Sequence, residues 1–332
     1  MAKSRHTAVS FLALCVLGGA TLLTMVLISP PAPLPADAPA ADFSAARAMQ
    51  DLALIAREPH PMGVFPAHAE VRDYLLSEIH ALDLEPQVQK TLGVRVVRPG
   101  VVLGGFVENI LVRLPGANPE GAILLMSHYD STPGGPGGVD SGSGVVTVLE
   151  LLRALHAGAP VRQDMIFLLT DGEEPGTFGS HAFVAQHPWF KDVRLVINLD
   201  QFSKGLMLLL HTNQGNGLWV QALARTVRRP TYMSLPDLFP GGETDLAPFA
   251  QSGIRGVDIQ PLEGKEIRFE FSAAGPIQFL IVEEKTGLPS FPGLSTQPEP
   301  GTMESPGEFG QGVAADFTAI YRNFVVRGLD RE

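Results

Sequence analysis

Apolar residues recur along the chain in two spacings, one typical of amphipathic helices and one typical of buried strands. The helical spacing predicts helices over about 43–57, 68–82, 145–156, 180–186 and 217–227. Short apolar runs predict strands at 86–89, 94–97, 109–114, 122–126, 165–170, 194–199 and 206–210. Because strands alternate with helices, we expect an α/β fold with a mainly parallel mixed sheet sandwiched by helices.

The longest apolar run predicts a transmembrane helix at the N-terminus. Residues 7–28 contain no charge, and about 20 apolar helical residues cross a bilayer. Lys3 and Arg5 precede the run and no basic residue follows before Arg47, so the positive-inside rule places the rest of the chain outside the cytoplasm, in a periplasm or lumen. The alternative is a cleaved signal peptide with its site at 36–38, which would give a secreted protein.

A linker is expected between this anchor and the remaining chain. Residues 29–41 are rich in Pro and Ala, a composition that favours a semi-rigid, extended spacer. We therefore divide the chain into a cytoplasmic tip with a signal anchor over 1–28, a linker over 29–41 and one domain over 42–332.

Composition narrows the class of protein. The 332 residues are 45% apolar and 18% charged, which suits a packed core rather than a disordered chain. With 24 Lys+Arg against 35 Asp+Glu the net charge is −11, which argues against nucleic acid as a partner. Cys15 is the single cysteine, so a metal site has to be built from His, Asp and Glu.

Acidic residues and one histidine follow the predicted buried strands. The residues that concern us are His128, Asp130, Asp140, Glu173, Glu174 and Asp200. Singly, each is more often an ordinary loop or surface residue. Together they would meet at the carboxyl edge of the sheet, where ligands of open α/β folds bind. So many carboxylates repel one another unless a cation lies between them, and zinc accepts both imidazole and carboxylate ligands.

Four segments carry a resemblance to a known family: SHYDS (127–131), GGVDSGSG (137–144), FLLTDGEEPGTFGSHAF (167–183) and VINLD (196–200). They resemble the co-catalytic di-zinc exopeptidases of peptidase clan MH, which include bacterial leucyl aminopeptidase and glutamate carboxypeptidase. The endoplasmic-reticulum metallopeptidase and vacuolar membrane protease branch is most similar, since EPHPMG (58–63), LLLHTNQGNGLW (208–219) and GGETDLAPF (241–249) also match it. The resemblance covers about 42–260.

This resemblance implies a zinc aminopeptidase (phosphorylase/hydrolase-like) fold, a peptide substrate and two zinc ions. It also implies a role for each residue at the strand ends. One zinc would be held by His128 and Asp200, and Asp140 would bridge the two ions. Glu174 would bind the second zinc. Asp130 would orient the imidazole of His128, and Glu173 would be the general base that takes a proton from the attacking water.

One ligand of this family has no counterpart here. The family supplies a C-terminal histidine, but no histidine follows His211. The segment 301–309 resembles what normally surrounds that histidine, whereas 262–300 diverges from the family. Three explanations stay open. Another residue such as Glu304 or His211 could substitute, the enzyme could work with one zinc or a weakly held second zinc, or the chain could be a pseudo-peptidase that binds peptide or metal.

Other polar residues receive less specific interpretations. His60 and His68 are expected to be structural, while Thr244 and Asp245 either line a substrate pocket or cap the helix that follows. The sequence therefore predicts a membrane-anchored zinc exopeptidase, by resemblance an aminopeptidase. A single-metal hydrolase or cyclase on the same scaffold is a further alternative. Side-chain specificity and oligomeric state have no signal in the sequence.

Overall fold

The computed structural model describes residues 12–24, 32–63, 65–200, 208–210, 234–235 and 244–260. Its strands are β1 (Gln87–Arg98), β2 (Val101–Leu114), β3 (Ala122–His128), β4 (Asp164–Thr170), β5 (Val193–Leu199), β6 (Leu208–Leu210), β7 (Ser234–Leu235) and β8 (Arg255–Gln260). Its helices include α2 (Ala45–Ile55), α3 (Pro66–His80), α4 (Gly142–Ala157), α5 (Phe178–Gln186), the 3-10 helix η1 (Pro188–Asp192) and α7 (Leu246–Gln251).

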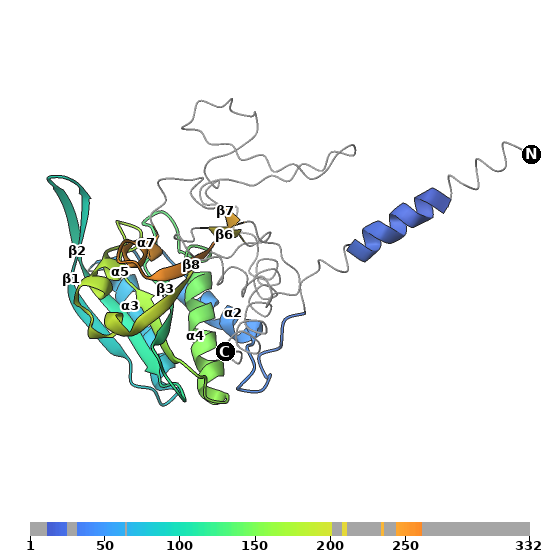
Figure 1. The fold of residues 1–332 in the computed structure, drawn as a ribbon, viewed down its shortest axis with the longest axis horizontal. Coiled ribbons are helices and arrows are strands. Elements are labelled where there is room, and N and C mark those ends of the chain that lie inside the picture. Colours follow the sequence, from blue (N-terminus) through green and yellow to red (C-terminus); the bar gives the residue numbers. More distant parts are fainter. Residues whose placement is uncertain are drawn as a thin grey trace, which may run out of the picture.

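The strands form one mixed sheet in the order β1-β2-β4-β3-β5-β8-β6-β7 (Figure 1). At its centre β3 pairs in parallel with β4 and β5, and β5 pairs in parallel with β8. The β1–β2 hairpin joins β4 antiparallel at one side. The predicted α/β sandwich is therefore confirmed, with an antiparallel hairpin added beside the parallel centre.

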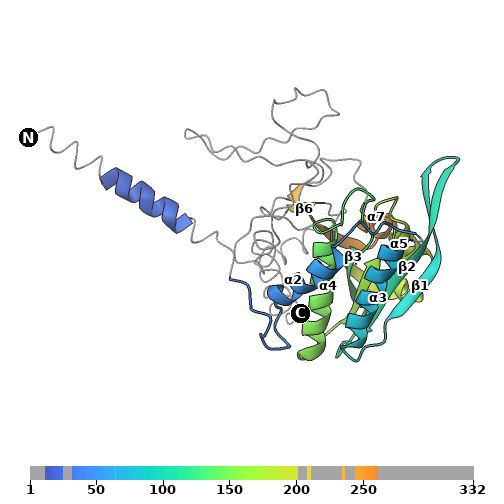
Figure 2. The ribbon, with the colours of Figure 1, turned by 180° about the vertical axis from the view of Figure 1, so that it is seen from behind.

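Alternate residues of the central strands enter two separate cores. Ile123 and Leu125 of β3 lie in the core formed with α2, α3 and α4, whereas Leu124 and Met126 lie in the core formed with α5 and α7. Figures 1 and 2 show these two helical layers from opposite sides. Because successive side chains of a strand point to opposite faces, both kinds are buried, and the strand has an unbroken apolar sequence.

The N-terminal part of the domain is held onto α4 by buried polar contacts. The hydroxyl of Ser44 caps α2 by accepting the N–H of Arg47 at 3.2 Å. Arg47 in turn donates to the carbonyl groups of Ala36 and Ala38 at 2.6 and 2.8 Å, and its Nε donates to Glu150 at 3.2 Å. The later part of the predicted linker is thus hydrogen-bonded to the domain.

The described part of the N-terminal segment is helical. Residues 12–24, inside the predicted anchor, form a helix with exposed side chains. Among the described residues no helix combines the length and the apolar character that crossing a bilayer requires. The anchor over 7–28 stays a prediction.

The elements differ from their predicted bounds mainly in the β1–β2 hairpin. The separate runs at 86–89 and 94–97 belong to one strand, and β2 begins eight residues before the predicted strand at 109. Gly104 and Gly105 obscured this extension, because paired glycines are typical of loops. The predicted helix at 217–227, the divergent segment 262–300, and His211 and Glu304 lie outside the described residues.

Candidate metal centre

The parallel pairing of β3, β4 and β5 brings their carboxyl ends to one edge of the sheet. His128 is the last residue of β3, and it pairs with Thr170 at the end of β4. Asp200 directly follows β5. The structure therefore places these strand ends side by side, and the loops that follow them surround one buried point.

Three of the four predicted metal ligands meet there. The imidazole Nε2 of His128 lies 3.0 Å from Oδ1 of Asp140 and 3.2 Å from Oδ1 of Asp200. One ligand atom from each of the three residues lies within 4.8 Å of the other two. His128 and Asp200 are buried, and Asp140 is partly exposed. This set of one nitrogen and two carboxylate oxygens suits zinc.

An unpaired oxygen supports this interpretation. Oδ1 of Asp200 is buried and, within the described part of the chain, receives no hydrogen bond. A buried carboxylate oxygen without a donor costs free energy, about 1–3 kcal/mol or more for a charged group. A bound cation would satisfy it, so the residues present fit a metal ion.

The orientation of His128 is that of a metal ligand. Its Nδ1 lies 3.0 Å from the backbone carbonyl of Asp130 and 3.5 Å from Oδ1 of the same residue. When Nδ1–H donates to this carbonyl, the neutral ring has its lone pair on Nε2, where a metal ion would bind, whereas in the protonated ring Nε2–H donates to Asp140 at 3.0 Å. Asp130 thus orients the ring chiefly through its backbone.

The carboxylate of Asp130 instead links two loops. It accepts the backbone N–H of Glu173 at 3.0 Å and that of Glu174 at 3.3 Å. Asp130 follows β3, and Glu173 and Glu174 lie in the loop after β4, which we call the glutamate loop. These hydrogen bonds therefore fix the glutamate loop relative to His128. The buried position of Asp130 strengthens them, since water does not compete.

Glu173 lies beside the cluster without belonging to it. Its Oε2 is 3.9 Å from Nε2 of His128, and its side chain is 15% exposed. Burial raises the pKa of Glu173 well above its ordinary value, and Asp200 and Asp245 add to the rise while His128 opposes it. A carboxylate with a raised pKa is a stronger proton acceptor, as a general base requires.

Glu174 is placed differently from the other predicted ligands. Its backbone is held by Asp130, but among the described residues the group within 4.8 Å contains His128, Asp140 and Asp200 without Glu174. A role for Glu174 at a second metal therefore stays a prediction.

The loop that carries Asp140 is shaped by glycines. Gly137 has φ of +67°, which favours glycine, and its carbonyl accepts the N–H of Gly142 at 2.7 Å. Gly144, in the first turn of α4, lies so close to β5 that a Cβ there would be 2.0 Å from the carbonyl oxygen of Leu199. The absence of a side chain thus lets α4 approach the strand that ends at Asp200.

The carboxylates near His128 change the pKa of its imidazole. Burial by itself lowers the pKa of His128, but contacts with Asp130, Asp140 and Asp200 outweigh it and hold that pKa well above the ordinary value. Burial also raises the pKa of Asp200, which His128 partly offsets. In the metal-free protein the imidazolium therefore supplies the positive charge that the carboxylates need.

Sequence reasoning did not assign a role to Asp171, the residue before Gly172. Its carboxylate accepts the N–H of Glu108 at 2.9 Å and lies 2.8 Å from Nε2 of the buried His68. His68 also stacks on Tyr129, with ring centroids 5.1 Å apart. The structural role expected for His68 is thus a contact between α3 and the glutamate loop. A sequence pattern could not reveal this pair, since its members are 103 residues apart.

Asp245 was assigned only loosely from the sequence. It stands at the N-cap of α7 but makes no capping hydrogen bond with its side chain. Instead its carboxylate accepts the hydroxyl of Thr170, and its Oδ1 is buried without a partner among the described residues. Burial raises the pKa of Asp245 to about 6. Thr244, by contrast, accepts the N–H of Leu246 at 3.3 Å and so does the capping.

Residues 109–276 match the profile of Peptidase family M28. This stretch contains all the residues of the candidate centre.

Two sequence relatives and one solved structure define the similarity further. The chain is 34% identical over 218 residues to a vacuolar membrane protease of Candida albicans (strain WO-1), covering 63% of this chain and 25% of that protein. It is 30% identical over 210 residues to endoplasmic reticulum metallopeptidase 1 of Mus musculus, covering 57% and 23%. The chain thus spans about a quarter of the length of the curated relatives it matches. BSAP, a zinc aminopeptidase from Bacillus subtilis, has a similar fold, with a TM-score of 0.55 at 16% identity over 66% of this chain and 85% of that one.

Proposed function

The chain belongs to peptidase family M28, and on this premise we propose that it is a membrane-anchored zinc exopeptidase, specifically an aminopeptidase that removes N-terminal residues from peptides. The observation that carries the proposal is the buried group of His128, Asp140 and Asp200, with an unpaired carboxylate oxygen facing a histidine nitrogen. The names of the relatives, a vacuolar membrane protease and an endoplasmic reticulum metallopeptidase, support membrane attachment and peptide hydrolysis.

In this proposal His128, Asp140 and Asp200 hold zinc, and the side chain of Glu173 acts on the water that attacks the peptide. Zinc, when bound, lowers the pKa of water and polarises a carbonyl group. Glu173 lies 3.9 Å from His128 and accepts the proton that the attacking water loses. It then delivers this proton to the nitrogen of the leaving peptide, since the same carboxyl group serves as base and acid in turn.

The surrounding residues support this proton transfer by position. Asp130 holds the backbone of Glu173 at 3.0 Å, so the base stays at a fixed distance from the metal ligands. Asp245 adds negative charge near Glu173, which raises the proton affinity of the base.

For the second zinc we propose weak or absent binding. Glu174 and Asp140 are the two family ligands that remain for it, and the C-terminal histidine has no counterpart. A site with fewer strong ligands holds its ion less tightly. We therefore expect a firmly bound ion at His128 and Asp200 and a labile one, if any, at Glu174.

The proposed location follows from the predicted anchor. Residues 7–28 would hold the chain in the bilayer, with the domain on the periplasmic or lumenal side because the basic residues lie N-terminal to the apolar run. Cleavage of this segment would instead release the domain as a secreted enzyme.

The central test is Glu173→Gln in the full chain reconstituted with lipid. Glutamine keeps the size of the side chain but accepts no proton, so hydrolysis of aminoacyl anilides is expected to fall by about 100-fold to 10,000-fold. Bound zinc, measured by elemental analysis, should stay unchanged because Glu173 is not a ligand. The matched control is Glu120→Gln, a glutamate that is 71% exposed, and it should behave as the parent.

The alternative function is that of a pseudo-peptidase that binds peptide or metal without turnover, and the missing histidine favours it. A folded parent protein that shows no hydrolysis at saturating zinc would support this alternative and contradict the proposed enzyme. A single-metal hydrolase or cyclase would bind one zinc per chain even at saturating zinc and would still lose its activity in Glu173→Gln.

A further inference from the structure

The β1–β2 hairpin extends beyond the rest of the sheet at the edge where the metal centre lies. β2 pairs with β4 only from Ile110 to Leu114, whereas β1 and β2 pair with each other as far as Arg98 and Val101. Residues 92–106 therefore form an antiparallel arm without a third strand beside it, and this arm projects from the domain in both views (Figures 1 and 2).

Exposed apolar residues occur on both faces of this arm, since Leu103, which pairs with Arg95 on the face of Gly93 and Gly105, is 44% exposed. On one face the glycines lie against the domain, since a Cβ on Gly93 would come 2.2 Å from the carbonyl oxygen of Phe178 and a Cβ on Gly105 would come 2.6 Å from Cε of Met62. The opposite face carries five large apolar residues that we call the apolar stripe. They are Leu92, Val94, Val96, Val102 and Phe106, which are 44%, 44%, 68%, 59% and 79% exposed.

Such a stripe is unusual for a surface in water. Cross-strand pairs join Leu92 to Phe106 and Val96 to Val102, so the apolar residues are neighbours rather than scattered. Full burial of one such side chain contributes about 1.5–3 kcal/mol, and strands at the edge of a sheet normally carry charges or prolines that prevent association. A contiguous exposed apolar patch is typical of a surface that binds a membrane or another protein.

The charges of the arm indicate which kind of apolar partner covers the stripe. Residues 86–107 include Lys90, Arg95 and Arg98 and no acidic residue, although the whole chain has a net charge of −11. Lys90 pairs with Glu108 at the base of the arm, at 2.8 Å. Arg95 alternates with Val94 and Val96 and so lies on the face of Gly93, whereas Arg98 stands at the turn beyond the apolar stripe. An apolar stripe that ends at an arginine fits the boundary between acyl chains and anionic headgroups. A second copy would bring like charges together across a two-fold interface.

The stripe faces the helical layer to which the N-terminal segment is attached, although the arm and that segment lie at opposite ends of the domain (Figures 1 and 2). It shares a face of β2 with Ile110 and Val112, whose side chains pack into the core formed with α2, α3 and α4. The N-terminal segment is attached to this same layer, since the hydroxyl of Ser44 donates to the carbonyl of Leu34 at 3.1 Å. Only the five residues 29–33 separate Leu34 from the predicted anchor, a reach of about 17–20 Å when extended.

From these contacts we infer that the outer part of the β1–β2 hairpin is a membrane-binding arm for anionic lipid. The apolar stripe enters the interface of the bilayer, and Arg98 at the turn lies among the lipid phosphates. The arm would hold the catalytic edge of the sheet beside the membrane surface. This inference goes beyond the proposed peptidase activity and does not depend on it.

The test places an environment-sensitive fluorophore on the stripe of the full chain. In a Cys15→Ser background, Val96→Cys is labelled with a nitrobenzoxadiazole dye and reconstituted into phosphatidylcholine vesicles with or without phosphatidylglycerol. The control position is Glu120→Cys, which is 71% exposed and precedes β3 at the opposite edge of the sheet. We expect emission at shorter wavelength and quenching by doxyl-labelled lipid at position 96 with phosphatidylglycerol present, and neither effect at 120.

A second variant tests the contribution of charge. Arg98→Glu in the same labelled protein should reduce the quenching at 96 in anionic vesicles while the circular dichroism of the protein stays unchanged. Emission typical of water at position 96 in both kinds of vesicle would overturn the inference. Short-wavelength emission that doxyl lipid does not quench would also overturn it, because a protein surface, either another part of this chain or a second copy, would then cover the stripe.

Discussion

The backbone N–H of Glu173 donates to the carboxylate of Asp130 at 3.0 Å. This hydrogen bond joins the loop after β4, which carries the proposed base, to the loop after β3, whose strand ends at the proposed zinc ligand His128. The relative position of base and ligand therefore depends on one buried carboxylate.

Asp130→Asn tests this dependence. An amide offers one acceptor oxygen where the carboxylate offers two, so either Glu173 or Glu174 loses its hydrogen bond. We expect kcat to fall by about 10–100-fold, the usual effect of losing a residue that orients a metal site. Steady-state kinetics with aminoacyl anilides measures this change.

The control for that experiment is Asp73→Asn. Asp73 is 64% exposed and pairs with Arg72 on the surface, and an exposed ion pair contributes little to stability. Its kinetics should equal those of the parent. Equal activity in Asp130→Asn and the parent would show that the loop keeps its position without the carboxylate.

Gly144→Ala should separate α4 from β5. Alanine normally stabilises a helix relative to glycine by up to about 1 kcal/mol, but here its Cβ would lie 2.0 Å from the carbonyl oxygen of Leu199. The helix has to move, which we expect to cost about 1–3 kcal/mol and to weaken zinc binding because Asp140 moves away from Asp200. Urea unfolding and zinc titration measure the two effects.

Gly134→Ala is the matched comparison, since no atom lies within 4 Å of a Cβ at that position. It should leave stability and zinc affinity unchanged. A Gly144→Ala protein as stable as this control would contradict the close contact.

Zinc affinity should rise with pH. The carboxylates around His128 hold its pKa well above the ordinary value, so at neutral pH the metal-free protein carries a proton that zinc has to displace. When one proton is released, the logarithm of the association constant rises by about one per pH unit below that pKa. Competition with a chelating dye between pH 6 and pH 8 measures this slope, and an affinity independent of pH would show that His128 is already neutral.

Asp51→Asn should change how the free energy of unfolding depends on pH. Asp51 lies in α2, far along the chain from the metal centre. Burial raises the pKa of Asp51 to about 6, although the hydroxyl of Tyr74 donates to it at 2.8 Å. A raised carboxyl pKa disfavours ionisation in the folded state. The stability that the neutral group contributes is therefore complete below about pH 4 and is lost as pH rises through 6.

An asparagine keeps the acceptor for Tyr74 and does not ionise. Relative to the parent, Asp51→Asn should thus gain about 1–2 kcal/mol of unfolding free energy between pH 4.5 and pH 7.5, less than the full pKa shift implies because Asp51 is partly exposed. Urea denaturation at the two pH values checks the sign. A constant difference between the proteins would exclude a raised pKa.

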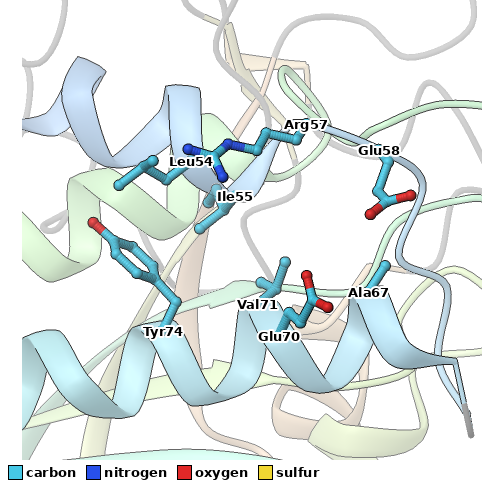
Figure 3. A pocket seen from close by; sticks show the side chains of 8 residues that line it. All are labelled: Leu54, Ile55, Arg57, Glu58, Ala67, Glu70, Val71 and Tyr74. Atoms are coloured by element: carbon cyan, nitrogen blue, oxygen red, sulfur yellow. The ribbon is translucent and has the colours of Figure 1, made fainter.

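Tyr74, whose hydroxyl donates to Asp51, lines a small groove between α2 and α3. The groove has a volume of about 140 Å³ and is lined by Leu54, Ile55, Arg57, Glu58, Ala67, Glu70, Val71 and Tyr74 (Figure 3). Its rim carries charges of both signs, from Arg57 on one side and Glu58 and Glu70 on the other. Unfolding measurements on Asp51→Asn therefore also report on the packing of these two helices.

The sequence was informative wherever residues were buried on both sides of a strand. The apolar runs that end at His128 and Asp200 could be recognised without structural data, and the parallel order then placed both residues at one edge. Contacts between distant segments could not be recognised in this way. Asp245 meets Thr170 across 75 residues, and neither residue belongs to a local pattern that predicts the other.

The contribution of Asp130 was predicted only in part. The resemblance assigned its carboxylate to the imidazole of His128, and the structure gives the shorter contact to its backbone carbonyl, at 3.0 Å against 3.5 Å. The spacing in the sequence indicates that Asp130 lies near His128. The backbone conformation determines which atom of Asp130 contacts the imidazole.

The attachment of residues 34–42 to the domain bears on how a shortened protein should be designed. Arg153 donates to the carbonyl groups of Ala40 and Asp42, and Arg47 donates to those of Ala36 and Ala38. A version that begins at residue 42 would keep the acceptors on Asp42 and Glu150 but would lose the carbonyl acceptors of Ala36, Ala38 and Ala40. Removal of the apolar N-terminus by a protease site should therefore be placed before Leu34, where the cut would spare every one of these contacts.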